Sequence, residues 1–470
     1  MTHDVIVIGA GQGGVPVAAL LAESGRRVLL AERGEVGGTC VNRGCTPSKS
    51  LIASAQAAHD ARRAGRLGVR AAVEVDFRAV MERVDGIVLQ WRAGVQRRLD
   101  RAGDRLRVVH GHARLAGDGR VEVNGETHQA ETIVLNVGTR HAVPPIPGLD
   151  SVPYLTNGSI FALRELPERL VCIGGGYIGC ELGQAMRRLG SEVAIIDPGP
   201  RLLAREDPAV SAAMEAVFRD EGIDVRTGSR PARVERRGGG VAVVLEDGSA
   251  VEGSHLLVAT GRIPNTSDLG CEAAGVRLDG RGFVTVDEGF RTSAEGVYAI
   301  GDCTGGPQFT HRAWDDGRIL FDILVGRRTG GRDGRLVPYA MFTDPQVGRV
   351  GLTEAEAREQ GIDYDVAEMP FEWVARAVEA GVPAGVMRVM VDRKTERFLG
   401  VSLVGSQAGE LVHVFSVLMQ AGATARTVVD TEFIHPTFAE GLQTLVMKLP
   451  RYALAPCPAS EAAQEPAAAV

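Results

Sequence analysis

A short apolar run near the N-terminus, residues 4–8, is followed at once by a glycine-rich turn, residues 9–14. An apolar run of this length is typical of a strand that is buried on both faces of a parallel sheet. The pattern then predicts a helix to about Ser24 and a second strand at residues 28–31, ending at Glu32. The order of strand, glycine turn, helix and strand predicts the start of a nucleotide-binding domain.

The same pattern returns in the middle of the chain. An apolar run at residues 170–173 leads into a second glycine turn at 174–179, a helix to about Leu189 and a strand at 193–196 that ends at Asp197. Two copies of this unit predict two nucleotide-binding domains in one chain.

The remaining segments complete an α/β chain. They are an alanine-rich helical stretch from Pro47 to about Ala102, strand-like alternation at 105–143, a strand and helix at 297–324 that resume the first domain, a linker at 326–334, a third unit of strands and helices at 335–450, and a tail from Ala455. The tail is rich in Pro, Ala, Ser and Glu, so we expect it to be disordered.

Composition narrows the class of protein. A chain of 470 residues is too long for one hydrophobic core, so about two to four domains are expected. A net charge of −7 gives no indication of nucleic-acid binding. The N-terminal apolar run has no basic segment or cleavage site and is too short to span a membrane, so we expect a cytoplasmic protein.

Seven cysteines in a chain of this length do not indicate a secreted disulfide scaffold. Cys172 and Cys180 flank the second glycine turn and are predicted to lie in the core. Cys40 and Cys45 are separated by four residues, and Pro47 is well suited to begin a helix after them. We expect a loop that could close into a disulfide, with the helix N-terminus favouring a thiolate. Metal ligation and an inert place in the core remain alternatives, although no second ligand group lies at zinc spacing nearby.

Both glycine turns have the spacing Gly-x-Gly-x-x-Gly, at Gly9, Gly11 and Gly14 and at Gly174, Gly176 and Gly179. The first glycine permits a tight turn, the second lets the backbone approach a pyrophosphate, and the third lets the helix pack close to the strand. The helix N-terminus then offers free N–H groups to the phosphates. Glu32 and Asp197 each lie 18 residues beyond the last glycine (32 − 14 and 197 − 179), where a carboxylate can bind a ribose diol.

Residues 37–49 read Gly-Gly-Thr-Cys-Val-Asn-Arg-Gly-Cys-Thr-Pro-Ser-Lys. This run resembles the active-site signature of the class I pyridine nucleotide-disulfide oxidoreductases, a family that includes dihydrolipoyl dehydrogenase, glutathione reductase and mercuric reductase. The resemblance covers residues 1 to about 452, and further segments carry it: 111–113, 137–139, 259–265, 299–302 and 435–440.

The resemblance implies an α/β fold with two Rossmann-like dinucleotide-binding domains, for FAD and NAD(P), and a C-terminal α+β dimerisation domain. The implied boundaries are residues 1–145 and 265–334 for the FAD-binding domain, 146–264 for the NAD(P)-binding domain, 335–452 for the dimerisation domain and 453–470 for the disordered tail.

Roles for single residues follow from the same resemblance. Cys40 would exchange with the substrate, and Cys45 would lie against the flavin. Lys49 and Glu181 would form an ion pair near the flavin, and Tyr177 would cover the nicotinamide pocket, although a tyrosine after a glycine loop can also simply pack. The residues implied to contact FAD are Gly9, Gly11, Gly14, Glu32, Thr39, Lys49, Ala113, Gly138 and Asp302, and those implied to contact the nicotinamide nucleotide are Gly174, Gly176, Gly179, Asp197 and Gly261.

His435 would act as the acid/base for Cys40 across a homodimer interface, because in this family the histidine comes from the partner subunit. Glu440 lies five residues further on. A histidine that is oriented by a carboxylate is also the physical form of a general base. The resemblance therefore implies a homodimer whose subunits share the active site.

The sequence leaves the substrate open. Arg43 and Thr46 replace the small or aliphatic residues usual in the family, and this variant resembles the mercuric-reductase-like branch, as does segment 201–207. The tail has only Cys457 in place of the vicinal cysteine pair of mercuric reductases, and His-Pro-Thr at 435–437 is typical of disulfide-reducing members. We expect electron transfer to a disulfide or another thiol-reactive oxidant. A dihydrolipoyl dehydrogenase of a 2-oxoacid complex and a flavoprotein diaphorase or redox sensor are the alternatives.

The nicotinamide preference is also divided. Asp197 should hold a ribose diol and repel a 2′-phosphate, which favours NADH, whereas Arg201 and Arg205 could bind that phosphate. The balance slightly favours NADH. We expect no resident metal, no nucleic acid and no membrane partner.

Overall fold

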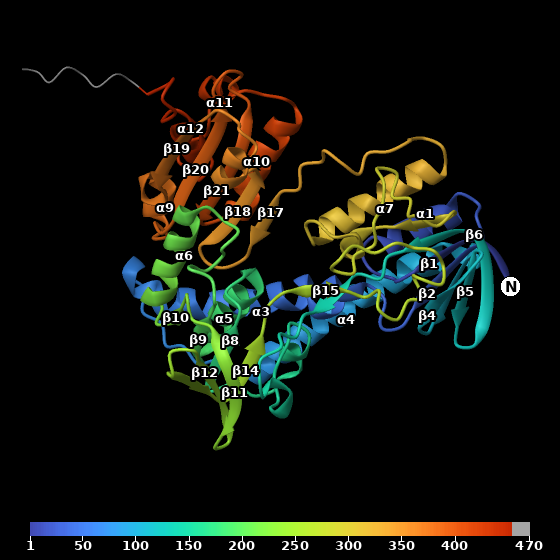
Figure 1. Ribbon diagram of the computed structural model, residues 1–470. Coiled ribbons are helices and arrows are strands. Elements are labelled where there is room, and N and C mark those ends of the chain that lie inside the picture. The colour runs from blue at the N-terminus through green and yellow to red at the C-terminus, as the bar shows by residue number, and fades with distance from the viewer. Residues whose placement is uncertain (454–470) are drawn as a thin grey trace, which may run out of the picture. The chain divides into compact units, whose positions relative to one another are not determined.

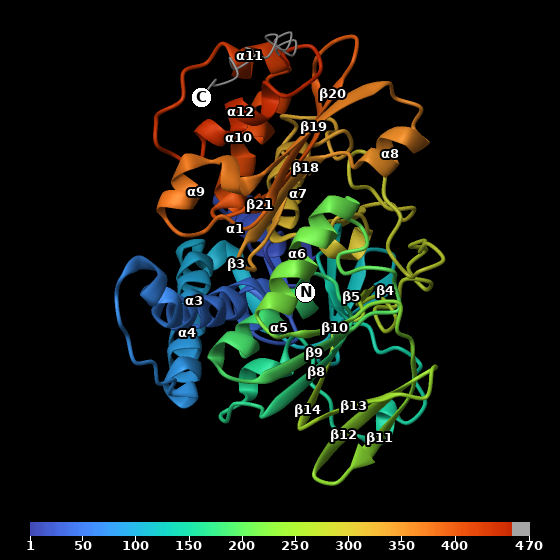
Figure 2. The same cartoon turned by 90° about the vertical axis from the view of Figure 1, so that its left-hand side faces the viewer.

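The computed structural model describes residues 1–453, which form two compact units (Figure 1, Figure 2). One unit contains Met1–Arg205 and Met214–Thr343, and the other contains Glu206–Ala213 and the chain from Asp344 onward. The tail expected from Ala455, with Cys457, lies outside the described residues. Within them, no helix is both long and apolar enough to cross a membrane.

The first glycine turn belongs to a seven-stranded sheet. At its centre β1 (Thr2–Ile8) pairs in parallel with β2 (Val28–Glu32) and with β6 (Glu126–Leu135). The other strands are β3 (Leu106–His110) beside β2, β5 (Arg120–Val123) and β4 (Ala113–Gly117) beyond β6, and β16 (Val297–Ala299), which also pairs with β6. The strands predicted at residues 4–8, 28–31 and 297 onward are confirmed.

Helices cover this sheet because its central strands are apolar on both faces. The helix α1 (Gly14–Glu23) and the helix α7 (Thr310–Leu324) share one core with Val5, Val7 and Leu30. Figure 1 shows α7, in yellow, beside α1, in blue, although almost 300 residues separate them in the chain. Residues 297–324 therefore return to the sheet and the core that contain the first glycine turn.

The second glycine turn belongs to a four-stranded parallel sheet of order β10-β9-β8-β14. Its strands are β8 (Arg169–Ile173), β9 (Glu192–Ile196), β10 (Asp224–Arg226) and β14 (His255–Val258), with α5 (Tyr177–Leu189) between β8 and β9. An antiparallel sheet of β11 (Pro231–Arg237), β12 (Gly240–Leu245) and β13 (Ala250–Gly253) packs against it around a shared apolar core. Cys172 and Cys180 are fully buried here, as predicted.

The structure corrects the prediction for the helical stretch and the redox loop. Residues 41–44 do not form a loop, because Gly38–Arg43 is a helix, α2. Gly37 and Gly38 both have positive φ, which lets the chain turn sharply into α2. The next helix, α3 (Cys45–Arg63), begins at Cys45, so Pro47 is its third residue. The stretch then breaks at residues 68–76 before α4 (Phe77–Arg101).

The second unit is built on an antiparallel sheet of order β18-β21-β20-β19. The strands are β18 (Gln346–Gly351), β19 (Tyr364–Pro370), β20 (Val386–Asp392) and β21 (Phe398–Gly405). The helices are α8 (Glu354–Glu359), α9 (Ala375–Glu379), α10 (Ala408–Gln420), α11 (Ala425–Val429) and α12 (Glu440–Val446). This is the unit of strands and helices predicted for residues 335–450.

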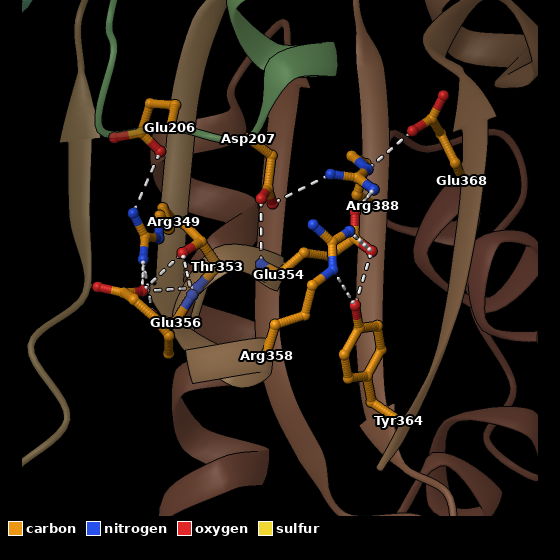
Figure 3. Close-up of polar contacts among 11 residues, drawn as sticks. Glu206, Asp207, Arg349, Thr353, Glu354, Glu356, Arg358, Tyr364, Glu368 and Arg388 are labelled. Atoms are coloured by element: carbon orange, nitrogen blue, oxygen red, sulfur yellow. Dashed lines mark hydrogen bonds and ion pairs between the residues drawn. The ribbon is translucent and has the colours of Figure 1, made fainter. Parts of the chain in front are cut away.

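A cluster of charged residues lies inside this second unit (Figure 3). We call it the arginine cluster; its members are Glu206, Asp207, Arg349, Glu354, Glu356, Glu368 and Arg388. The guanidinium of Arg388 lies 3.1 Å from Asp207 and 2.7 Å from both Glu354 and Glu368. Because Glu206 and Asp207 precede α6 (Pro208–Asp220), these contacts explain why the short segment 206–213 belongs to the second unit.

Candidate active site

The two cysteines lie at adjoining helix ends. Cys40 is the third residue of α2, and Cys45 is the first residue of α3. Neither is in a disulfide, and a hydrogen bond joins their sulfurs. The turn between the two helices is made by Gly44, where an added Cβ would lie 2.9 Å from the carbonyl oxygen of Thr39.

The pair holds one proton unequally. The hydrogen bond from Cys40 is the largest influence on Cys45 and, helped by Thr310 and Lys49, lowers the pKa of Cys45 to about 6. The same bond raises the pKa of Cys40 well above its usual range, and burial adds to the effect. At neutral pH the reduced pair is therefore a Cys40 thiol that donates to a Cys45 thiolate, and the proton belongs to both residues as a coupled system.

A cavity of about 170 Å³ opens over the two sulfurs. The structure brings seven further residues predicted for the site together with the dithiol, because the cavity is also lined by Gly11, Thr39, Lys49, Gly138, Tyr177, Glu181 and Asp302.

The expected ion pair is present in this cavity. The Nζ of Lys49 lies 2.7 Å from Glu181 Oε2, and Glu181 is buried. The other carboxylate oxygen of Glu181 accepts a hydrogen bond from the backbone N–H of Phe342 at 2.8 Å, and Lys49 also lies over the Phe342 ring. These contacts fix both side chains at the edge of the cavity.

Tyr177 lines the cavity at the start of α5 and remains 40% exposed. Its ring lies 6.3 Å from that of Phe309, which stacks on Tyr339 at 5.0 Å. The side chain is therefore held by an aromatic neighbour on one side and is accessible on the other, as a movable cover requires.

The first glycine turn fits a dinucleotide. At Gly14 an added Cβ would lie 2.0 Å from the Gly9 carbonyl oxygen, so only glycine permits α1 to begin so close to β1. Gly11 lines the cavity itself. Both oxygens of Glu32 accept backbone N–H groups, from Ala10 and from Gly34, each at 2.7 Å. The carboxylate therefore orders the turn, and each of its oxygens keeps acceptor capacity that a ribose diol could use.

The second turn repeats this arrangement. An added Cβ at Gly179 would lie 2.0 Å from the Gly174 carbonyl oxygen, whereas at Gly176 it would meet nothing within 4 Å. Asp197 accepts the N–H of Gly175 at 2.6 Å and that of Gly199 at 2.7 Å. The open space at the N-terminus of α5 is where the backbone can meet a pyrophosphate.

Asp302 lies beside the cavity with its carboxyl largely buried. Burial raises its pKa, and the hydroxyl of Thr139 donates to it at 3.2 Å. Thr139 in turn accepts from Nε of Arg262 at 2.7 Å. A carboxyl with one hydroxyl partner fits a ligand that carries further hydroxyl groups, as the ribityl chain of FAD does.

The other predicted contacts are placed less directly. At Gly138 and Gly261, both with positive φ, an added Cβ would meet nothing within 4 Å, and Gly138 lines the cavity. Ala113 begins β4 with its side chain in the sheet core, so only its backbone can contact a ligand. Arg201 donates to the carbonyl oxygen of Ala204 at 3.4 Å, within its own loop, and Arg205 is exposed.

His435 and Glu440 form the expected pair in the second unit. Nδ1 of His435 lies 2.8 Å from Glu440 Oε2, and the imidazole is 70% exposed. Glu440 is the first residue of α12. The carboxylate fixes the ring so that Nε2 is available for proton transfer.

Two polar residues at the site were missed from the sequence. Thr310 lies 3.2 Å from the Cys45 sulfur although 265 residues separate them, and Arg262 reaches Asp302 through Thr139. Arg262 stands in a segment that the sequence analysis had singled out, 259–265, whereas Thr310 follows no motif.

Two sequence profiles match the chain. The profile of the pyridine nucleotide-disulphide oxidoreductases matches residues 3–317, and that of the family's dimerisation domain matches residues 337–446. The chain belongs to this family. Dihydrolipoyl dehydrogenase from Thermus scotoductus is 38% identical to it over 465 residues, covering 96% of this chain and 98% of the relative. Mercuric reductase from Staphylococcus aureus is 34% identical over 446 residues, covering 94% and 81%.

A solved structure agrees with these matches. The HOCl-induced flavoprotein disulfide reductase RclA from Escherichia coli has a TM-score of 0.86 at 33% identity and covers 94% of this chain and 99% of its own. The chain is thus an FAD- and NAD(P)H-dependent oxidoreductase with the predicted α/β fold. Its match to the dimerisation domain indicates a homodimer.

Proposed function

We propose that this enzyme takes two electrons from NAD(P)H and delivers them through the Cys40–Cys45 pair to a disulfide or another thiol-reactive oxidant. The observation that carries the proposal is the pair of unbridged cysteines, which lies in one cavity with the Lys49–Glu181 ion pair. FAD, when bound, would accept the hydride of NAD(P)H and return the electron pair to the Cys40–Cys45 disulfide.

The dithiol would then reduce a substrate disulfide in two exchanges. Cys40 gives its proton to His435 of the partner subunit and attacks one substrate sulfur, so that the substrate's S–S bond breaks and a mixed disulfide forms. The leaving thiolate takes the proton back from the imidazole. The Cys45 thiolate next attacks the Cys40 sulfur, which forms the internal disulfide and releases the second substrate thiolate, protonated by solvent.

Supporting residues would hold the cofactors. The first glycine turn with Glu32, and Asp302 with Thr139, would bind FAD, whereas the second glycine turn with Asp197 would bind the nicotinamide nucleotide. Lys49, Ala113, Thr39 and Gly138 would complete the FAD contacts, and Gly261 those of the nucleotide. Tyr177 would cover the nicotinamide, and NADH would be slightly preferred. The domain boundaries given above and a cytoplasmic location remain predictions.

The test is an acceptor panel with either NADH or NADPH. The acceptors are lipoamide, glutathione disulfide, a small aromatic disulfide, Hg(II) and, as an acceptor that needs no thiol, a quinone. We expect Cys40→Ser to abolish turnover of the disulfides and to retain quinone reduction, while Cys271→Ala, a buried cysteine away from the cavity, keeps both.

The result also separates the alternatives. The reverse reaction, oxidation of dihydrolipoamide by NAD, is assayed beside the panel, and a rapid rate would favour the dehydrogenase role, suggested by the relative from Thermus scotoductus. Disulfide turnover in Cys40→Ser equal to that of the parent would leave a diaphorase and contradict the proposal.

A further inference from the structure

Among the described residues outside α2 and α3, Thr310 is the one whose side chain hydrogen-bonds to the Cys45 sulfur. Its hydroxyl oxygen lies 3.2 Å from Sγ of Cys45. The same hydroxyl is also within hydrogen-bonding reach of the Cys40 sulfur. Because it carries a single proton, it donates to whichever of the two sulfurs is the thiolate. Thr310 is the first residue of α7, a helix of 15 residues, yet no side chain caps that helix. The N-cap position of this helix is held by Phe309, which has no side-chain acceptor, and the Thr310 hydroxyl beside it is directed to the sulfur.

The direction of this hydrogen bond follows from the surroundings of the sulfur. Cys45 is the first residue of α3, and neither α3 nor α7 has an acidic residue in its first turn. Helix N-termini favour negative charge through their free N–H groups. Cys40 already donates to Cys45. A thiolate can only accept, so the Thr310 hydroxyl is the donor.

Lys49 does not replace this donor. Its ammonium group is paired with Glu181 at 2.7 Å, and the Glu181 carboxylate itself disfavours the thiolate. The two groups together therefore act weakly on the sulfur. A short-range donor in contact with Sγ contributes more than a cation whose charge is neutralised nearby.

We propose that Thr310 donates the hydrogen bond that holds the Cys45 sulfur as a thiolate, so that Cys40 keeps the single proton of the reduced pair. This rests on the proposed function, in which Cys40 attacks the substrate and Cys45 resolves the mixed disulfide. With the proton on Cys40, that residue attacks only after a base has removed the proton. Cys45 is already a thiolate and can attack the mixed disulfide as soon as it forms. The Thr310 hydroxyl thus makes two chemically identical side chains differ in protonation, as their different roles in the exchange require.

The test is a pH titration of Cys45 in the holoenzyme with Cys40→Ser as the parent, which leaves Cys45 as the only thiol of the pair. The thiolate is followed by its long-wavelength charge-transfer absorbance and, separately, by its rate of alkylation with iodoacetamide, read by mass spectrometry. Thr310→Val should raise the midpoint by about one to two pH units, which corresponds to about ten- to a hundred-fold in the thiol–thiolate equilibrium. Thr310→Ser should return it close to the parent value.

The matched control is Thr46→Val, which removes a hydroxyl from the residue after Cys45 that makes no hydrogen bond with the sulfur. An unchanged midpoint in Thr310→Val, or an equal shift in Thr46→Val, overturns the proposal. Thr310→Ala removes the same hydroxyl and takes the place of the valine variant if that one does not fold. The proposed function is tested by a different result. Disulfide turnover without Cys40 in the acceptor panel contradicts it, even where Thr310→Val shifts the midpoint.

Discussion

The imidazole of His435 is oriented by one neighbour, the carboxylate of Glu440, which lies 2.8 Å from its Nδ1. If the imidazole carries the proton between Cys40 and the leaving thiolate, His435→Ala should lower disulfide turnover by about 10²–10⁴-fold. Reduction of the enzyme by NADH should be nearly unchanged, because that half-reaction needs no proton transfer at the substrate. Glu440→Gln should cause a smaller loss, since it only orients the ring. Stopped-flow and steady-state rates separate the two half-reactions.

The control for this prediction is His413→Ala, on the exposed side of α10 in the same unit. It should leave both rates at the parent level. A loss of NADH reduction as large as the loss of disulfide turnover in His435→Ala would contradict the proton-transfer role.

Two histidines that contact each other, His3 and His128, give a prediction about pH and stability. His3 Nε2 and His128 Nδ1 lie 3.3 Å apart, and the His128 side chain has no exposed surface. Burial, with the Met1 ammonium and Arg107, lowers the pKa of both rings, while Glu126 acts in the opposite sense on His128. The unfolded chain therefore binds more protons below about pH 6.5. The contribution of the neutral histidine pair to the free energy of unfolding should therefore be fully present above about pH 6.5 and be lost as the pH falls below it.

Thermal unfolding at pH 8 and at pH 5 measures this effect. The decrease in Tm between the two should be smaller in His128→Gln, whose side chain does not titrate. An identical decrease in the variant would assign the acid sensitivity to other groups.

At the scale of elements, the strand–turn–helix units could be predicted from sequence because each is local. In each unit a buried apolar strand, three glycines and a helix follow one another in a short stretch of chain. These stretches are residues 2–23 and residues 169–189. The sequence separation from Gly14 to Glu32, and likewise from Gly179 to Asp197, also identified the acid that belongs to each glycine turn. Each acid binds its own glycine turn, so its position is fixed by the same loop.

Other parts of the site could not be predicted because their causes are not local. The helix α2 is too short to show periodicity and depends on two glycines with positive φ and on Asn42, whose amide donates to the Val36 carbonyl oxygen at 3.0 Å. Thr310 meets Cys45 only because α7 returns to the first sheet. A threonine in a helix's first turn carries no mark in sequence that it faces a sulfur.

The loop after β9 gives a prediction about nucleotide choice. Asp197→Asn keeps the size of the side chain and removes its charge, so the ratio of kcat/KM for NADPH to that for NADH should rise several-fold as repulsion of the 2′-phosphate is lost. Arg201→Ala and Arg205→Ala should lower the same ratio if these side chains bind the phosphate. Because Asp197 also accepts two backbone N–H groups of its loop, KM should rise for both nucleotides. An equal loss with both in all three variants would remove the specificity argument.

The arginine cluster gives a prediction about stability. Arg388→Met removes the cation beside the buried Asp207 and one of the two arginines paired with the partly buried Glu354, which should lower the free energy of unfolding of this unit by about 3–5 kcal/mol. The control is Arg393→Met, just beyond the same strand, whose exposed ion pairs with Asp363 and Asp365 should contribute little. Urea unfolding followed by near-UV circular dichroism compares the two. Equal effects would mean that burial of the cluster is unimportant.

At the scale of the whole molecule, the match to the dimerisation domain indicates a homodimer, and the proposed mechanism needs one because Cys40 and His435 would act from different subunits. Mixing His435→Ala with Cys40→Ser tests this directly. A heterodimer of the two holds one site with both residues intact and one with neither. Random exchange in a twofold dimer makes half of the molecules heterodimers, so activity should return to about a quarter of the parent level from two nearly inactive proteins. Subunit exchange is verified with differently tagged chains, and no recovery after verified exchange would show that each site is built within one chain.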